Sequence, residues 1–117
     1  MARTIAFARR FAETARLSQD AADQLVVIVE EWAANIVEHG GAAPTSLIVL
    51  RLQREGAATR ITFTDAGVAF DPRTAQDQGP NLERGGGAGI ALIRSWCDIE
   101  AYERRAGRNR LVLRSRS

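Results

Sequence analysis

One stretch of the chain places a carboxylate and an amide where they could act together. Glu31 and Asn35 are four residues apart in an apolar segment, so both side chains lie on one face of a helix, one turn from each other. Such a pair can hold a hydrated magnesium ion and orient a nearby water or hydroxyl. The alternative is a solvated polar stripe shared with neighbouring glutamates, although an asparagine inside an apolar helix is unusual.

A second group, Asp65-Ala66-Gly67, ends a predicted strand. The carboxylate of Asp65 could accept a hydrogen bond from an exocyclic amine such as that of adenine. Gly67 would let a ligand approach the backbone closely because it has no side chain. Aspartate and glycine also suit ordinary strand-ending turns, and on its own this group favours the turn.

A third group is the run Gly85-Gly86-Gly87-Ala88-Gly89, which opens a predicted helix over about 89–96. The free N–H groups and the positive dipole end of a helix N-terminus suit a phosphate. The residues before the run are predicted to be loop rather than strand, which counts against a dinucleotide-binding Rossmann motif. A flexible tether is the alternative.

The elements that must position these groups follow from periodicity. Apolar residues recur at helical spacing over 4–16, and again after the N-cap residue Ser18 until Gly40-Gly41 ends the second helix. The predicted strands are 46–53, 59–64, 98–104 and 109–114, with turns at 54–56 and 106–107. This order of elements predicts an α+β fold, a two-layer sandwich of helices on a mostly antiparallel, mixed sheet.

The segment 65–89 is long for a connection inside a compact domain. It is rich in Gly, Pro, Asp and Gln, and its few apolar residues are too sparse to pack as a core. Segments of this kind are commonly functional lids, so we expect it to form or cover a binding site.

Composition narrows the classes of function. The length of 117 residues suits one domain. All sixteen basic residues are arginines, which excludes a P-loop and an ordinary protein kinase, because both need a lysine at the phosphates. One histidine and one cysteine cannot build a zinc site. Since no apolar run reaches the length of a membrane helix and the first residues lack a signal peptide's apolar centre, we expect a cytoplasmic protein without a membrane partner.

Arginines crowd the C-terminal end of the chain. They are Arg104, Arg105, Arg108, Arg110, Arg114 and Arg116. A nucleic-acid footprint is one interpretation of such clustering. We favour a solvated edge strand whose charged flanks resist aggregation, so direct nucleic-acid binding is not expected.

In combination, the three groups are more specific than any one of them. Glu-x-x-x-Asn on a helix, Asp-x-Gly after the second strand and Gly-x-Gly before a later helix resemble the N, G1 and G2 boxes of the GHKL ATP-binding superfamily, whose domain is the Bergerat fold. Within it, the chain resembles the anti-sigma-factor serine/threonine kinases. The motifs that carry this likeness are Glu31-x-x-x-Asn35-x-x-x-His39-Gly40, Gly67-Val68-Ala69-Phe70-Asp71-Pro72 and Gly87-Ala88-Gly89-Ile90. The likeness covers about residues 5–114, which implies a single ATP-binding kinase domain over 1–117.

The resemblance implies a role for each position. Asn35 would ligate Mg²⁺ at the phosphates of ATP or ADP, and Glu31 would be the general base. Asp65 would bind the adenine amine, with Gly67 beside the base, and the segment 73–86 would be the ATP lid. The residues expected at the phosphates are Gly85, Gly87, Ala88 and Gly89, with Arg84 of the lid as a further candidate beside its alternative, a solvated loop arginine.

Three positions depart from the pattern of the group. Ala69 stands where a second glycine is common, which could tighten the turn or reshape the base pocket. Asn109-Arg110 replaces Gly-Thr, which removes a hydroxyl that often supports the nucleotide site. Only residues 2–4 remain for a strand that usually precedes the first helix. If that strand helps relatives to dimerise, its loss weakens the expectation of a homodimer that the resemblance implies.

The implied activity is ATP-dependent phosphorylation of a serine on an anti-sigma-factor antagonist of STAS-like type. A sigma factor or a similar regulator would be the second partner. The alternative is a module that sequesters such a regulator and holds nucleotide as a structural ligand only. Glu31 favours the kinase, because sequestration needs no base.

Overall fold

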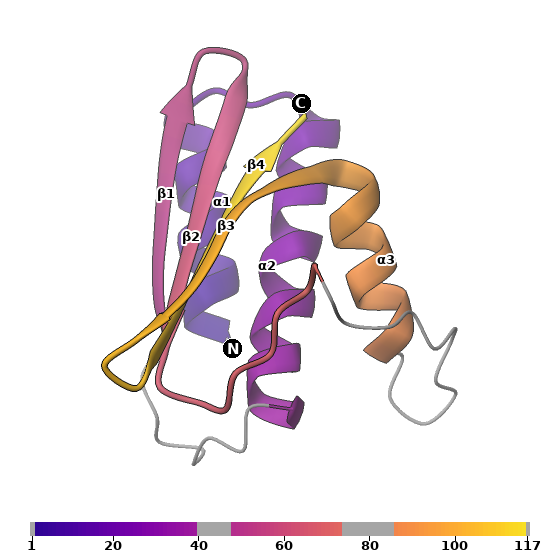
Figure 1. The fold of residues 1–117 in the computed structure, drawn as a ribbon. Helices are drawn as coiled ribbons and strands as arrows, with labels where there is room; N and C mark the ends of the chain where they lie inside the picture. Colours follow the sequence, from indigo (N-terminus) through magenta and orange to yellow (C-terminus); the bar gives the residue numbers. More distant parts are fainter. Residues whose placement is uncertain (1, 40–47, 74–85, 117) are drawn as a thin grey trace.

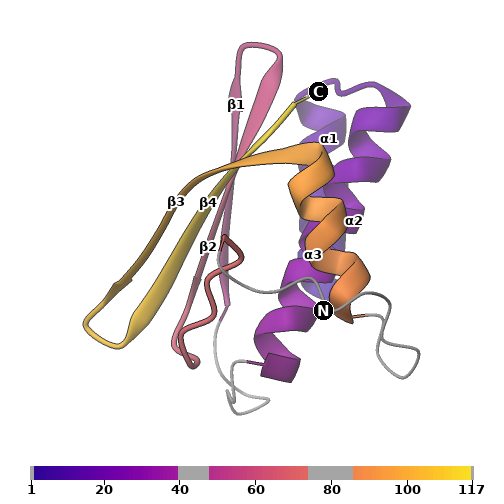
Figure 2. The same cartoon turned by 45° about the vertical axis from the view of Figure 1, so that its right-hand side comes forward.

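The computed structural model describes residues 2–39, 48–73 and 86–116. Its elements, in chain order, are α1 (Ala2–Thr14), α2 (Gln19–His39), β1 (Val49–Glu55), β2 (Ala58–Asp65), α3 (Gly86–Trp96), β3 (Cys97–Arg105) and β4 (Arg108–Ser115). The strands form one sheet in the order β1-β2-β4-β3, and the three helices cover one of its faces (Figure 1; Figure 2). The predicted α+β sandwich is confirmed. Every strand pair in the described part of the chain is antiparallel, so the sheet is not mixed there.

The two N-terminal helices meet at a well-defined junction. The Ser18 hydroxyl accepts a hydrogen bond from Ala21 N at 3.1 Å, which confirms the predicted N-cap of α2. Before it, α1 ends at Thr14, and Arg16, two residues later, has a φ of 57° in the left-handed region, a common conformation just after a helix. The helix α1 already begins at Ala2, so residues 2–4 are helical and supply no preceding strand.

The core lies between α2 and the inward face of the two central strands. Ile61 and Phe63 of β2 pair with Leu113 and Leu111 of β4, and all four are at most 1% exposed. Helix α2 packs Ile28, Val29 and Trp32 against them, and α3 adds Ile93. Because successive side chains of a strand alternate between faces, the same inward face of β2 carries Asp65 and that of β4 carries Asn109.

The arginines of the last strand were placed wrongly by the sequence analysis. The strand β4 lies inside the sheet, between β2 and β3, rather than at an edge. Its outward arginines reach carboxylates of other strands: Arg110 lies 3.9 Å from Glu103 of the adjacent β3, and Arg114 lies 3.6 Å from Glu55 of β1, across β2. A run of charges along a strand does not distinguish an edge from a centre when other strands of the sheet supply the opposite charges.

The third helix is longer than expected. It begins at Gly86, whereas the glycines led us to begin it near Gly89, since glycine disfavours helix by about 1 kcal/mol per residue. At its C-terminal end, Cys97 is buried, and burial raises the pKa of its thiol to about 12. Among the described helices, none is both long and apolar enough to cross a membrane.

Candidate active site

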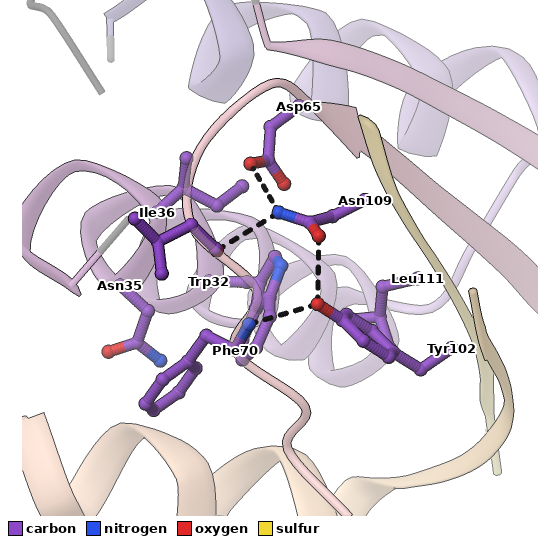
Figure 3. Close-up of a pocket in the computed structure, with 9 residues that line it drawn as sticks. Trp32, Asn35, Ile36, Asp65, Phe70, Tyr102, Asn109 and Leu111 are labelled. Carbon is purple, nitrogen blue, oxygen red and sulfur yellow. Dashed lines mark hydrogen bonds between the residues drawn. The ribbon is translucent and has the colours of Figure 1, made fainter. Parts of the chain in front are cut away.

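A pocket opens between α2 and the ends of β2 and β4 (Figure 3). Its lining residues are Trp32, Asn35, Ile36, Asp65, Val68, Phe70, Tyr102, Asn109 and Leu111. Two of the three groups singled out in the sequence, those of Asn35 and Asp65, thus meet in one pocket although they lie on different elements. The rings of Trp32 and Phe70 form an apolar wall, with centroids 6.0 Å apart.

Asp65 presents one carboxylate oxygen to this pocket and uses the other for the protein. Its Oδ1 accepts hydrogen bonds from Gly67 N at 2.8 Å and from Asn109 Nδ2 at 3.1 Å. The side chain is buried, with 8% exposed, and no described residue donates to Oδ2. The carboxylate is therefore oriented, with one acceptor left for a donor on a ligand.

Asn109 is a site residue that the sequence analysis missed. Its Nδ2 donates to Asp65 Oδ1 and to the carbonyls of Gly67 and Val68, each at 3.1 Å. Its Oδ1 accepts from Tyr102 Oη at 2.9 Å and from Arg104 at 2.8 Å. We expected the replacement of Gly-Thr to remove a supporting group. The amide of Asn109 instead supplies one, and we refer to Asp65, Gly67, Tyr102, Arg104 and Asn109 together as the Asp65 cluster.

The segment after Gly67 is held along the same hairpin. Phe70 N donates to Tyr102 Oη at 2.9 Å, and Arg104 donates to Gly67 O at 2.8 Å. Ala69, the first of the three departures, is exposed and is not among the described residues with positive φ. An alanine therefore fits this turn without backbone strain, and no glycine is required.

The lid expected over 73–86 is described only at its two ends. Arg73 is anchored by Asp71, with a contact of 2.8 Å, and its hydrogen bond lowers the pKa of that carboxyl. Arg94 of α3 donates to Pro72 O. Gly86 belongs to α3, while residues 74–85, which include Arg84 and Gly85, lie outside the described part of the chain.

At the other end of the site, Glu31 faces the first turns of α3. A Cβ built on Gly89 would lie 2.5 Å from Glu31 Oε2, so any larger residue there would displace the carboxylate from this position. Burial raises the pKa of Glu31, and the nearby charges of Glu30 and Glu38 raise it further. Gly87 and Ala88 lie in the same first turns of α3, where free backbone N–H groups suit an anion.

Asn35 completes this end, one helical turn after Glu31. It is buried, with 3% exposed, yet its Nδ2 has no hydrogen-bond partner within the described ranges. A buried amide without a partner typically costs about 1–3 kcal/mol, so its persistence fits a group completed by a ligand. We refer to Glu31, Asn35 and Gly89 as the Glu31 cluster.

The donor set also bears on the expected Mg²⁺. Around the described residues, no group of three or more His, Cys, Asp or Glu side chains could hold a metal. The amide oxygen of Asn35 is a hard ligand, and Mg²⁺ is usually bound by one or two protein ligands together with phosphates and waters. The residues therefore fit a magnesium ion that arrives with a nucleotide rather than a resident metal.

Comparisons with known proteins bear on the family and the fold. The family model described as a histidine kinase-like ATPase domain matches residues 1–115. Among solved structures, the fold is similar to that of the blue-light activated histidine kinase EL346 of Erythrobacter litoralis, with a TM-score of 0.58 and 17% identity over 82% of this chain. It is also similar to a histidine kinase domain structure of the same protein, with a TM-score of 0.55 and 17% identity over 80% of this chain.

The chain corresponds to only a part of those structures, 30% of the first and 46% of the second. A search of curated proteins finds no match. At this level of identity the structural likeness shows the fold alone, whereas the family match spans nearly all of the sequence. The chain belongs to the histidine kinase-like ATPase domain family.

Proposed function

We propose that this domain binds ATP with Mg²⁺ and transfers the terminal phosphoryl group to a serine of an anti-sigma-factor antagonist protein. The observation that carries the proposal is the approach of Glu31 to α3, with Oε2 so close to Gly89 that a Cβ there would lie only 2.5 Å away. This places a carboxylate beside the helix end that suits phosphates. A pure nucleotide-binding module has no need of a base at that point.

Each residue contributes a separate task. Asp65 Oδ2 accepts a hydrogen bond from the amine of adenine, and the N–H groups opening α3 donate to phosphate oxygens. The Asn35 amide oxygen would hold Mg²⁺. Bound Mg²⁺ would neutralise charge on the phosphates. Phosphoryl transfer depends mainly on positioning and charge neutralisation, which these groups provide without a covalent intermediate on the protein.

Glu31 is the general base of the proposed transfer. The serine oxygen forms a bond to the terminal phosphorus, the bond between that phosphorus and the bridging oxygen of ADP breaks, and the serine proton passes to Glu31. A raised pKa favours this role, because proton transfer is most effective when the pKa of the base lies nearer the working pH. The partner is proposed from the resemblance to anti-sigma-factor kinases, as are a sigma factor or similar regulator and a homodimer.

The test is phosphate transfer from labelled Mg-ATP to the antagonist protein by the wild type and by Glu31→Gln. We expect the variant to bind ATP within a few-fold of the wild type and to lose about 10²- to 10⁴-fold in transfer rate. If the wild type binds ATP tightly and transfers nothing to antagonist proteins, the kinase proposal fails. The sequestration module with a structural nucleotide would then stand.

A further inference from the structure

Asn109 lines the pocket, but the proposed function gives its side chain no contact with the nucleotide. Asn109 is buried, with 4% exposed, and its amide takes part in five hydrogen bonds within the Asp65 cluster. Buried polar side chains with every group satisfied fix a single arrangement of their neighbours.

The partners of Asn109 allow only one orientation of its amide. Arg104 can only donate, and the carbonyls of Gly67 and Val68 can only accept. The Oδ1 atom must therefore face Arg104 at 2.8 Å, and Nδ2 must face the two carbonyls and Asp65 Oδ1, each at 3.1 Å. A flipped amide would place oxygen against three acceptors.

This fixed amide determines which oxygen of Asp65 faces the pocket. Together with Gly67 N at 2.8 Å, Asn109 Nδ2 occupies Oδ1 with two donors. The Oδ2 atom remains an acceptor without a described donor. We infer that Asn109 is the positioning residue that makes Asp65 selective for a 6-amino purine over a 6-oxo purine. The inference rests on the proposed binding of ATP.

The selectivity has a simple physical origin. A 6-amino group donates a hydrogen bond to Oδ2, whereas a 6-oxo group brings a second acceptor to the same point. If Asp65 is free to rotate away from the base, it can relieve its contact with a 6-oxo group. When Asn109 holds Asp65 in place, Oδ2 can pair only with the donor of a 6-amino group.

The experiment measures the dissociation constants of ATP and of inosine triphosphate by calorimetry. The proteins are the wild type, Asn109→Leu and the control Arg110→Met. Arg110 follows Asn109 on β4, but its side chain is exposed and lies 3.9 Å from Glu103 on the outward face. We expect the wild type to prefer ATP by roughly 10- to 100-fold. Asn109→Leu should reduce this preference to within about threefold of unity, while Arg110→Met keeps the wild-type ratio.

If Asn109→Leu does not fold, Asn109→Ala carries the test, because it removes the donors to Asp65 without adding bulk or an oxygen beside the three acceptors. A wild-type preference in either folded Asn109 variant would overturn the inference, and so would an equal loss of preference in Arg110→Met. A wild type that binds neither nucleotide would overturn nucleotide binding as well. The two failures are therefore distinguishable.

Discussion

Around Asp65 in the pocket, protein groups satisfy one another, whereas around Asn35 and Glu31, one helical turn apart on α2, they remain poorly satisfied. Asp65, Asn109 and Tyr102 exchange hydrogen bonds of 2.9–3.1 Å. By contrast, Asn35 Nδ2 has no partner in the described part of the chain, and Glu31 has a pKa raised mainly by burial. At the first end the protein holds Asp65 in place through its Oδ1 and leaves Oδ2 for a ligand, whereas at the second the groups themselves are held by few contacts.

This difference indicates a division of labour within the site. A pre-organised cluster favours recognition of one ligand, because no reorganisation is needed on binding. A cluster with a carboxylate whose pKa is raised by burial and an amide nitrogen without a described partner favours chemistry, because its groups are stabilised when charge and donors arrive. The stability of the two ends should therefore respond in opposite directions to mutation.

The largest expected effect is that of Gly89→Ala on transfer. The added Cβ would lie 2.5 Å from Glu31 Oε2 and would displace the carboxylate, and a misplacement of about 1 Å can cost about 100-fold in rate. The measurement is the rate of phosphate transfer to the antagonist. Ser95→Ala, an exposed change on the same helix, should leave the rate unchanged. Wild-type transfer by Gly89→Ala would contradict the placement of Glu31.

The next effect is a loss of nucleotide affinity in Asp65→Asn. The substitution puts an N–H donor where a 6-amino group must donate, so we expect ATP to bind about 10- to 100-fold more weakly. Calorimetric titration measures it, with Asp71→Asn as the control. Asp71 pairs with Arg73 and does not line the pocket. Equal affinities in the two variants would argue against Asp65 as the base-reading group.

A smaller effect is expected on stability from Tyr102→Phe. The variant loses the donor to Asn109 Oδ1 and the acceptor of Phe70 N, which should cost about 1–2 kcal/mol in the free energy of unfolding. Urea denaturation measures this loss. If stability does not change, the Asp65 end is less tightly organised than its hydrogen bonds indicate.

The smallest expected effect is a gain in stability rather than a loss. Because burial raises the pKa of Glu31 above its ordinary value of 4.5, the folded state is favoured while this group is protonated. That contribution is present below pH 4.5 and is lost as pH rises through the raised pKa. Glu31→Gln should therefore be slightly more stable than the wild type at neutral pH, with the difference vanishing in acid. Thermal melts against pH test this, with Glu13→Gln on α1 as control; a variant less stable at neutral pH would contradict it.

Local signals predicted most of the fold. Ser18 capped α2 as expected, and Ala106-Gly107 formed the second hairpin turn, with both residues at positive φ. The start of α3 was predicted too late because of its glycines. Packing on α2 stabilises these residues as helix, and intrinsic helix propensity does not include such packing. The position of β4 inside the sheet depends on pairing between distant strands, which its arginines alone do not reveal.

The site was predicted in part for the same reason. The pocket brings Asn35 and Asp65 together, as their motif implied, while their chemical roles remain predictions. Asn109 was missed because its partners Gly67 and Val68 lie more than 40 residues away in the sequence. One signal was available: Asn109 alternates with the buried Leu111 and Leu113, so period-2 spacing already placed a polar side chain on the inward face.

The turn between β3 and β4 has a consequence for the site that it does not touch. Ala106 and Gly107, with φ of 52° and 76°, set the pairing in which Arg104 lies opposite Asn109 and Tyr102 opposite Leu111. A slip of one residue in a strand turns all its side chains to the other face. An insertion of a single residue into this turn that shifts β3 against β4 would turn Tyr102 and Arg104 to the other face and remove both donors to Asn109 Oδ1, while the pairing with β2 keeps Asn109 opposite Asp65. The hairpin turn thus fixes the strand register that places Tyr102 and Arg104 beside Asn109.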